Sequence, residues 1–239
     1  MKFYVYCVAS TAVELDTSLI GVGGGAVEQL IVDGLSVVGS KFDTDLVSVS
    51  RGNILRHEAV VRKVLAIATP LPFRFGTLVT EPSLRSYVTS RKAALEHRLE
   101  TVKDCVEMSI KVIWQKAFDN DESPATKDDL GVGTAFLLAK RQELFGDERL
   151  VRKSQEIADW LSGRIKNLVK QENVSVHPKQ KLVLSGAYLV ERALQAQFRA
   201  RVEELVVERP DLHFLTSGPW PPYTFANIDL EFETQFGVS

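Results

Sequence analysis

The chain has 239 residues, of which 45% are hydrophobic and 25% charged, a composition typical of a soluble globular protein with one large domain or two ordinary ones. Its 29 basic and 31 acidic residues give a formal net charge of −2, which argues against nucleic acid as the main partner, because phosphate binding needs surplus Lys and Arg. The apolar run at the N-terminus is too short for a signal-peptide core or a membrane span, so we expect a cytoplasmic protein with no membrane partner.

Alternating apolar residues, caps and turn signals predict the elements of the N-terminal half. In chain order they are strands at 2–9, 27–32, 35–38 and 46–50, a helix at 53–68 with Asn53 as its N-cap, a strand at 71–78, a helix at 81–101 and a strand at 106–114. Gly21 to Gly25 (GVGGG) predicts a flexible loop. This loop loosely matches a dinucleotide fingerprint, but no strand directly precedes it and no long helix follows, so cofactor binding there is disfavoured.

A polar stretch from Phe118 to Leu130, which contains Pro124, predicts a domain boundary. We therefore divide the chain into an N-terminal domain at 1–118, a linker at 119–130 and a C-terminal domain at 131–239. The predicted elements after the linker are helices at 133–145 and 147–170, strands at 174–177 and 182–190, a helix at 191–208 and a strand at 212–216. Residues 229–236 alternate in polarity and predict either an edge strand or a mobile tail.

The order of these elements favours the α+β class, because neither half alternates strand and helix as a doubly wound sheet requires. We expect two domains of ferredoxin-like character, with mixed or antiparallel sheets packed against helices and joined by a helical segment.

The sequence carries no recognisable catalytic or metal-binding set. It lacks a G-x-S-x-G nucleophile elbow, its four histidines are scattered, and Cys7 and Cys105 are far apart. His57 lies on an apolar helical stripe, where a buried histidine with satisfied hydrogen bonds is the favoured interpretation. We predict no catalytic residues, no metal and no cofactor, and two buried thiols.

Strand aromatics leave two alternatives open, an RNA-binding module and a small-ligand enzyme on a ferredoxin-like scaffold. Tyr4, Tyr6, Phe73 and Phe75 could mimic the base-stacking aromatics of an RNA-recognition sheet. Packing against helices is favoured for Phe73 and Phe75, which share one face of their predicted strand. Arg74 between them must point the other way, either exposed or paired with a carboxylate.

The segment Ser217 to Phe225 (SGPWPPYTF) is rich in proline, which locks φ and removes backbone donors. The residues before the prolines, Gly218, Trp220 and Pro221, are expected to be extended or in a turn. Trp220 and Tyr223 would share a face of such a stretch. The favoured role is a clamp in which Trp220 packs on the helices of its own domain, and the alternative is direct contact with a partner.

Three segments together resemble the gas vesicle proteins GvpF and GvpL: Leu71–Thr77 (LPFRFGT), Ser185–Val190 (SGAYLV) and the SGPWPPYTF segment. The resemblance extends over the whole chain, and the compact, near-neutral sequence favours GvpF. It marks a set of motif residues with a structural or partner-binding role: Arg74, Phe75, Gly76, Gly218, Pro219, Trp220, Pro221, Pro222 and Tyr223.

The resemblance implies an accessory protein for gas vesicle assembly without enzymatic activity. It implies binding to the small, apolar main shell protein GvpA, contacts with other gas vesicle accessory proteins, and a place in the vesicle or its nucleation complex after a cytoplasmic stage. We expect the N-terminal domain to carry the shell-binding surface, because its short strands leave an open sheet edge.

Overall fold

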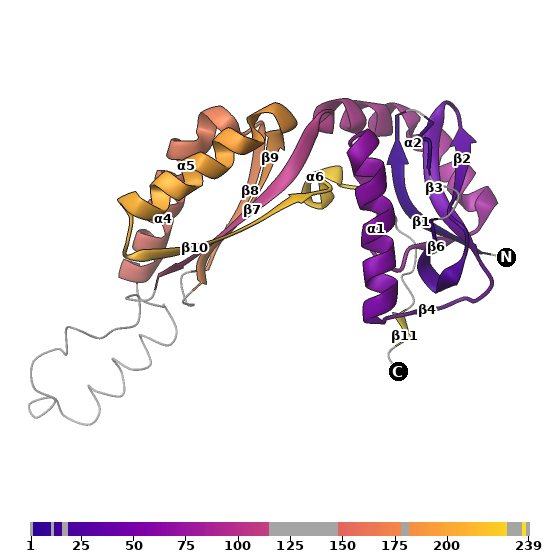
Figure 1. Ribbon diagram of the computed structural model, residues 1–239, viewed down its shortest axis with the longest axis horizontal. Helices are drawn as coiled ribbons and strands as arrows, with labels where there is room; N and C mark the ends of the chain where they lie inside the picture. The colour runs from indigo at the N-terminus through magenta and orange to yellow at the C-terminus, as the bar shows by residue number, and fades with distance from the viewer. Residues whose placement is uncertain are drawn as a thin grey trace, which may run out of the picture. The chain divides into compact units, whose positions relative to one another are not determined.

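The computed structural model describes residues 2–10, 12–15, 19–114, 148–177, 182–228 and 236–237 (Figure 1). They form an α+β fold with two main sheets, each packed with helices, as predicted. The chain divides into two compact units: unit 1 comprises Met1–Glu107 and Pro219–Ser239, and unit 2 comprises Met108–Gly218. The last 21 residues therefore group with the N-terminal half, whereas the predicted division assigned them to the second domain. The predicted linker at 119–130 and the helix at 133–145 lie outside the described residues.

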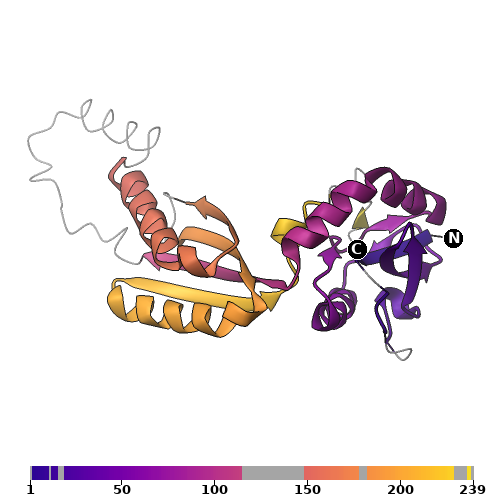
Figure 2. The same ribbon diagram turned by 90° about the horizontal axis from the view of Figure 1, so that it is seen from above.

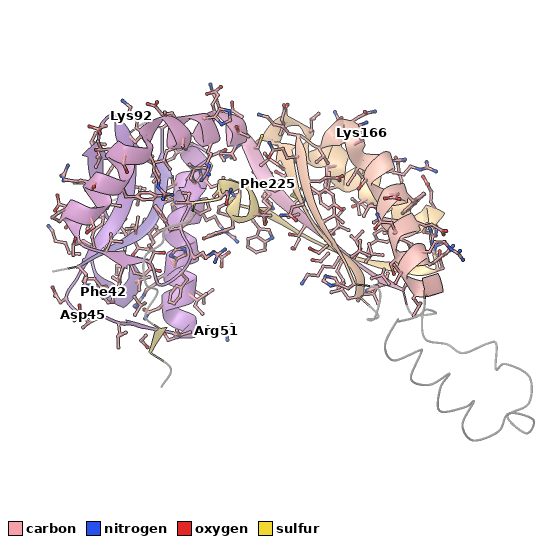
Figure 3. All side chains as sticks on the ribbon, turned by 180° about the vertical axis from the view of Figure 1, so that it is seen from behind. Phe42, Asp45, Arg51, Lys92, Lys166 and Phe225 are labelled. Atoms are coloured by element: carbon pink, nitrogen blue, oxygen red, sulfur yellow. The ribbon has the colours of Figure 1, made fainter. Side chains whose placement is uncertain are left out.

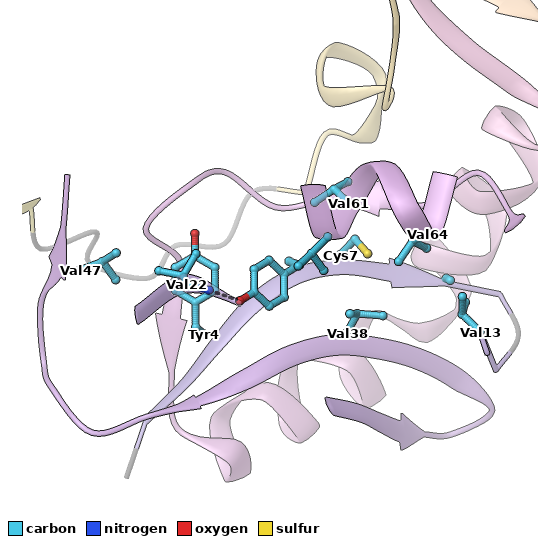
Figure 4. Close-up of a cluster of buried hydrophobic side chains, with 11 residues drawn as sticks. Tyr4, Cys7, Val13, Val22, Val38, Val47, Val61 and Val64 are labelled. Atoms are coloured by element: carbon cyan, nitrogen blue, oxygen red, sulfur yellow. Dashed lines mark hydrogen bonds between the residues drawn. The ribbon is translucent and has the colours of Figure 1, made fainter. Parts of the chain in front are cut away.

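Unit 1 is built on a sheet with the strand order β2-β3-β1-β5, in which β6 also pairs with β1. Its strands are β1 (Lys2–Ala9), β2 (Glu28–Val32), β3 (Leu35–Phe42), β5 (Leu71–Pro72) and β6 (Leu78–Val79). All its assigned pairs are antiparallel. Helix α1 (Arg51–Ile67) packs against one face of the sheet, and α2 (Glu81–Val102) lies on the other side (Figures 2 and 4).

The core between β1 and α1 is aromatic at one end and aliphatic at the other. Tyr4 and Tyr6 are fully buried there, together with Cys7, and they pack with valines of α1 (Figure 4). The register of β1 against β3 shifts between Val5 and Cys7. Such a bulge adds one residue to a strand and re-aims the side chains after it, which explains why Tyr6 and Cys7 share a core.

Helix α1 begins one residue after Ser50, which corrects the predicted N-cap. The Ser50 hydroxyl accepts the Asn53 backbone N–H at 3.2 Å, as an N-cap side chain does. The Asn53 side chain instead donates to the Ser48 carbonyl and accepts the Gly23 N–H at 3.2 Å. The glycine run is therefore anchored to α1 and is not a free loop. It leads into β2 with no intervening α-helix, so it is not a dinucleotide turn.

The predicted strand at 71–78 is interrupted. Its ends pair with β1 as β5 and β6, but residues 73–77 form a tight turn in which Thr77 donates to the Arg74 carbonyl at 2.7 Å. Gly76 has a φ of 90°, a left-handed conformation that favours glycine and is incompatible with a continuous strand. The two phenylalanines consequently do not share a strand face. Phe73 is buried against Tyr87 of α2, and Phe75 contacts Tyr4 on the α1 side.

Unit 2 is built on a four-stranded sheet with the order β10-β7-β9-β8. Its strands are β7 (Cys105–Trp114), β8 (Gln171–Val176), β9 (Leu182–Glu191) and β10 (Leu212–Trp220), and its α-helices are α4 (Glu148–Ile165) and α5 (Gln195–Glu208). Short 3-10 turns follow α4 at Lys166–Leu168 and precede α5 at Arg192–Leu194. Both helices and all four strands correspond to predicted elements, but β10 extends four residues beyond its predicted end, through Trp220.

Short elements complete the fold around unit 1. A 3-10 turn, η1 (Val22–Gly24), lies within the glycine run, and α6 (Tyr223–Ala226) follows β10. Strand β11 (Phe236–Gly237) pairs in parallel with β4 (Val47–Ser48). Strand β11 thus agrees with the predicted edge strand at Phe236. Residues 229–235 of that prediction lie outside the described residues.

Candidate functional site

The C-terminal segment, which we define as residues 219–228, begins with the last two residues of β10 and belongs to unit 1. Pro221 and Pro222 are both buried, and they stop the strand because neither can donate to a sheet ladder. Their carbonyls still accept hydrogen bonds: Tyr223 N–H donates to Pro221, and Ala226 N–H donates to Pro222 at 2.8 Å. The four-residue helix α6 forms over this turn and contains the half-buried Phe225 (Figure 3).

A chain of four hydrogen-bonded groups ties this segment to the core of unit 1. The Gly76 N–H donates to the Tyr4 hydroxyl at 3.1 Å, which lies 2.8 Å from His57 Nδ1. On the other side of the ring, His57 Nε2 lies 3.1 Å from the Tyr223 hydroxyl. We call this chain, Gly76–Tyr4–His57–Tyr223, the tyrosine–histidine relay. It joins three regions of the sequence, the first strand, the LPFRFGT turn and the PWPPY motif, through one helix residue.

The electrostatics of the relay favour an uncharged histidine. Burial lowers the pKa of His57 to about 4, against the raising effect of a hydrogen bond with the Phe73 backbone. Burial also raises the pKa of Tyr4 and Tyr223 well above the ordinary tyrosine value. Since the Tyr4 oxygen accepts from Gly76, its proton is available to Nδ1, and Nε2–H then donates to Tyr223. A neutral His57 with both nitrogens paired confirms the predicted satisfied core histidine.

A second polar contact holds α6 to β7. The Glu107 carboxylate, buried at 7% exposure, accepts the Thr224 backbone N–H at 2.8 Å and the Thr224 hydroxyl at 2.9 Å. Burial raises the pKa of Glu107, and the two Thr224 bonds act in the opposite direction. At the far end of the segment, Arg98 of α2 donates to the Asn227 carbonyl. The segment is thus anchored to α1, to α2 and to Glu107 near the start of β7, all within unit 1.

Trp220 contacts α1 through a cation–π interaction with Arg62. The guanidinium carbon of Arg62 on α1 lies 5.3 Å from the centre of the Trp220 ring, and Arg62 also pairs with Glu58 at 2.5 Å. Trp220 is half-buried. The partner in this contact is α1 of unit 1, whereas the predicted clamp used the helices of the second domain. The clamp role itself stays a prediction.

We expect Trp220→Ala to lower the free energy of unfolding by about 1–2 kcal/mol, because it removes a half-buried ring and a partly exposed cation–π contact. For a chain of this size that corresponds to a melting temperature lower by about 3–6 °C. Differential scanning calorimetry measures it, with Trp220→Phe as a control that keeps an aromatic face under Arg62. An unchanged melting temperature for Trp220→Ala would rule out the clamp.

The structure brings together some of the predicted motif residues and separates others. Phe75, Gly76 and Tyr223 meet around His57, with the Phe75 ring edge-on to the imidazole at 5.9 Å. Gly218 has a φ of 115°, which favours glycine, and its carbonyl accepts from Arg199 of unit 2 at 2.7 Å. Arg74 and Pro219 are exposed and make none of these relay contacts.

Sequence reasoning did not find several contacts of this site. Nothing local in the sequence indicates that the Glu107 carboxylate bonds to Thr224, 117 positions later. The sequence indicates Tyr4 only as a possible base-stacking aromatic and His57 only as a buried core histidine. Their pairing with Tyr223 had no sequence signal, because the three residues lie on separate elements.

The relay and the Glu107–Thr224 contact hold their polar groups in mutual hydrogen bonds. Tyr4, Tyr6 and Phe73 are at most 1% exposed, so none of the three can stack on a base, and the feature that favoured RNA binding is used in the core. Within the described ranges, no three His, Cys, Asp or Glu side chains gather closely enough to hold a metal ion. Both cysteines are buried free thiols, as predicted. None of the helices in the described part of the chain is long and apolar enough to cross a membrane.

Comparison with known proteins identifies relatives over nearly the whole chain. Residues 2–227 match the family model of the gas vesicle synthesis protein GvpL/GvpF. Gas vesicle protein L2 of Halobacterium salinarum is 25% identical, and the match covers 93% of this chain and 90% of that protein. Gas vesicle protein L of a Streptomyces species is 30% identical over 75% of this chain and 71% of its own length.

Among solved structures, the fold is similar to that of the gas vesicle protein GvpF from Anabaena, with a TM-score of 0.79, 22% identity and coverage of 96% of this chain and 97% of that one. GvpF from Microcystis aeruginosa gives a TM-score of 0.77 at 20% identity. The similar sequences include both GvpL and GvpF proteins, so the comparisons do not separate the two names.

Proposed function

Because this chain belongs to the gas vesicle synthesis protein GvpL/GvpF family, we propose that it is a non-enzymatic assembly and minor structural protein of gas vesicles that binds the main shell protein GvpA. The match of the family model over residues 2–227 is the observation that carries the proposal. The protein acts in the cytoplasm before assembly and then resides in the vesicle or its nucleation complex. Other gas vesicle accessory proteins join it there.

Physical chemistry gives such a protein a clear task. A shell subunit must expose apolar surface or sheet edges to assemble, and both are aggregation hazards before assembly is complete. A partner that covers these surfaces keeps the subunit available for growth of the shell.

Co-purification tests the proposal. The full-length chain, co-expressed with GvpA fused to a soluble carrier protein, should retain the fusion on an affinity column and should not retain the carrier alone. Purified gas vesicles should carry the chain on immunoblots after gentle washing. Absence of association in every order of expression would refute the proposed function.

The binding surface is best mapped with point variants in the full chain. A cut near Asp119 would separate the N-terminal part of unit 1 from the C-terminal segment, which supplies Tyr223 to His57 and Thr224 to Glu107. A half-chain that failed to bind would then report lost folding as readily as a lost surface.

A further inference from the structure

Unit 2 contains a groove of mixed polarity, with an apolar floor, beside the end strand of its sheet. The groove runs between α5 and β10 and holds about 560 Å³ of empty space, including the part that opens to solvent. Its floor consists of Met108, Phe198 and Val202, each at most 4% exposed.

The two walls follow from the periodicities of helix and strand. On α5, Arg199, Glu203 and Val206 are spaced four and three residues apart and therefore form one stripe. On β10, Phe214, Thr216 and Gly218 alternate and therefore face one side of the sheet. The groove thus runs parallel to the strand over four residue steps, roughly 13 Å. The Arg199 bond to the Gly218 carbonyl lies at the end nearest Pro219.

Strand β10 is an edge strand, and its one proline, Pro219, lies next to its last residue. It stands at one end of the strand order, so among the described residues the sheet continues only toward β7. Natural edge strands are commonly protected by charged residues. β10 contains no Lys, Arg, Asp or Glu, and Leu215, on the opposite face from the groove, is 46% exposed.

The other exposed edges and clefts differ in chemistry. In unit 1, edge strand β2 carries the charged Glu28, which pairs with Lys41. The cleft near the end of β2 is lined by several charged side chains, including Asp33, Lys92 and Glu96. Edge strand β8 of unit 2 bears the exposed Glu172. The α5–β10 groove combines an uncharged edge with an apolar floor.

We propose that β10 and α5 bind an extended, uncharged segment of a partner chain, which adds a strand to β10 and places a large apolar side chain in the groove. An edge strand pairs its backbone with an extended chain, and pockets beside it select alternate side chains. The wall charges balance, with one basic and one acidic residue, so the groove selects for an uncharged occupant. Resting on the proposed function, we assign this segment to the shell subunit. The contact then lies in unit 2, whereas strand lengths predicted it in the N-terminal domain.

Val206 and its neighbour Val207 provide a matched pair of variants. Val206 lines the groove at 43% exposure, while Val207 is 80% exposed and is not part of the groove wall. Arginine has a higher helix propensity than valine, so both substitutions should preserve α5. Val206→Arg places a charge at the groove mouth, and a bound apolar segment would have to desolvate it. Val207→Arg adds the same charge to the same helix turn outside the groove.

Binding of the full-length variants to GvpA fused to a soluble carrier is measured by biolayer interferometry. We expect Val206→Arg to weaken binding at least tenfold and Val207→Arg to change it less than twofold. Equal binding by both variants would overturn the groove assignment and leave the proposed function intact. No binding by the wild-type chain would instead refute the proposed function, so the two failures are distinguishable.

Hydrogen exchange on the wild-type chain provides a test that does not depend on a folded variant. Added GvpA fusion should slow exchange of β10 backbone amides between His213 and Ser217, because strand addition pairs outward-facing N–H groups. Slowing confined to β2 would overturn the assignment. So would a wild-type dimer in light scattering that Val206→Arg abolishes, because a second copy of the chain would then be the occupant.

Discussion

His57→Ala should lower the free energy of unfolding by about 4 kcal/mol, since it empties a buried ring position and leaves the Tyr4 hydroxyl without one of its two partners. For a chain of this length the melting temperature should fall by about 8–16 °C. Urea unfolding followed by circular dichroism measures the free energy. A chain with two compact units need not unfold in one step, and we expect the effect in the transition that reports unit 1.

Two further variants show how much each hydrogen bond of the relay contributes to the free energy of unfolding. Tyr4→Phe leaves the buried Gly76 N–H without an acceptor and should cost about 2 kcal/mol. Tyr223→Phe removes only the Nε2 partner, at a residue that is 37% exposed, and should cost about 1 kcal/mol. A Tyr223→Phe variant less stable than His57→Ala would contradict this ranking and show that the C-terminal segment, not the core ring, dominates the stability of unit 1.

The second large effect is destabilisation by mild acid. The pKa of His57 is about 4 in the folded protein and 6.5 in its ordinary environment. Between these pH values the unfolded chain binds a proton on His57 and the folded chain does not. The contribution of His57 to the free energy of unfolding is therefore complete above pH 6.5 and is lost as the pH falls to 4. The 2.5-unit difference corresponds to about 3 kcal/mol.

Glu107 makes the total pH profile a sum of opposing contributions. Burial raises its pKa, so its protonation on acidification favours the folded state and offsets part of the His57 loss. The difference between the wild-type profile and that of His57→Gln isolates the histidine, because Glu107 is common to both chains. Parallel profiles from pH 7 to pH 4 would show that His57 is not kept neutral by burial. A direct NMR titration of the His57 ring should give a midpoint near 4.

Local signals explain which elements sequence reasoning found. Strand β7 alternates, and Pro82 lies in the first turn of α2, where its missing N–H is harmless. The wrong predictions of the α1 N-cap and of a continuous strand at 71–78 also have local causes. Asn53 and Ser50 are both good capping residues, and only the geometry of the turn after β4 selects Ser50. The turn at 73–77 was read as continuous strand because Phe73 and Phe75 have high strand propensity, whereas Gly76 requires a positive φ.

The α+β class, the membership in the gas vesicle family and most of the helices and strands could be predicted from the residues alone, because each depends on short-range pattern or on a distinctive motif. The contacts of the PWPPY motif became visible only in the folded chain. Tyr223 bonds to His57 across 166 positions, and Thr224 satisfies Glu107 across 117. These contacts form only when distant parts of the chain fold together, and local residue propensities do not predict them. The groove beside β10 is likewise a product of packing, since a helix stripe and a strand edge define it only when they lie together.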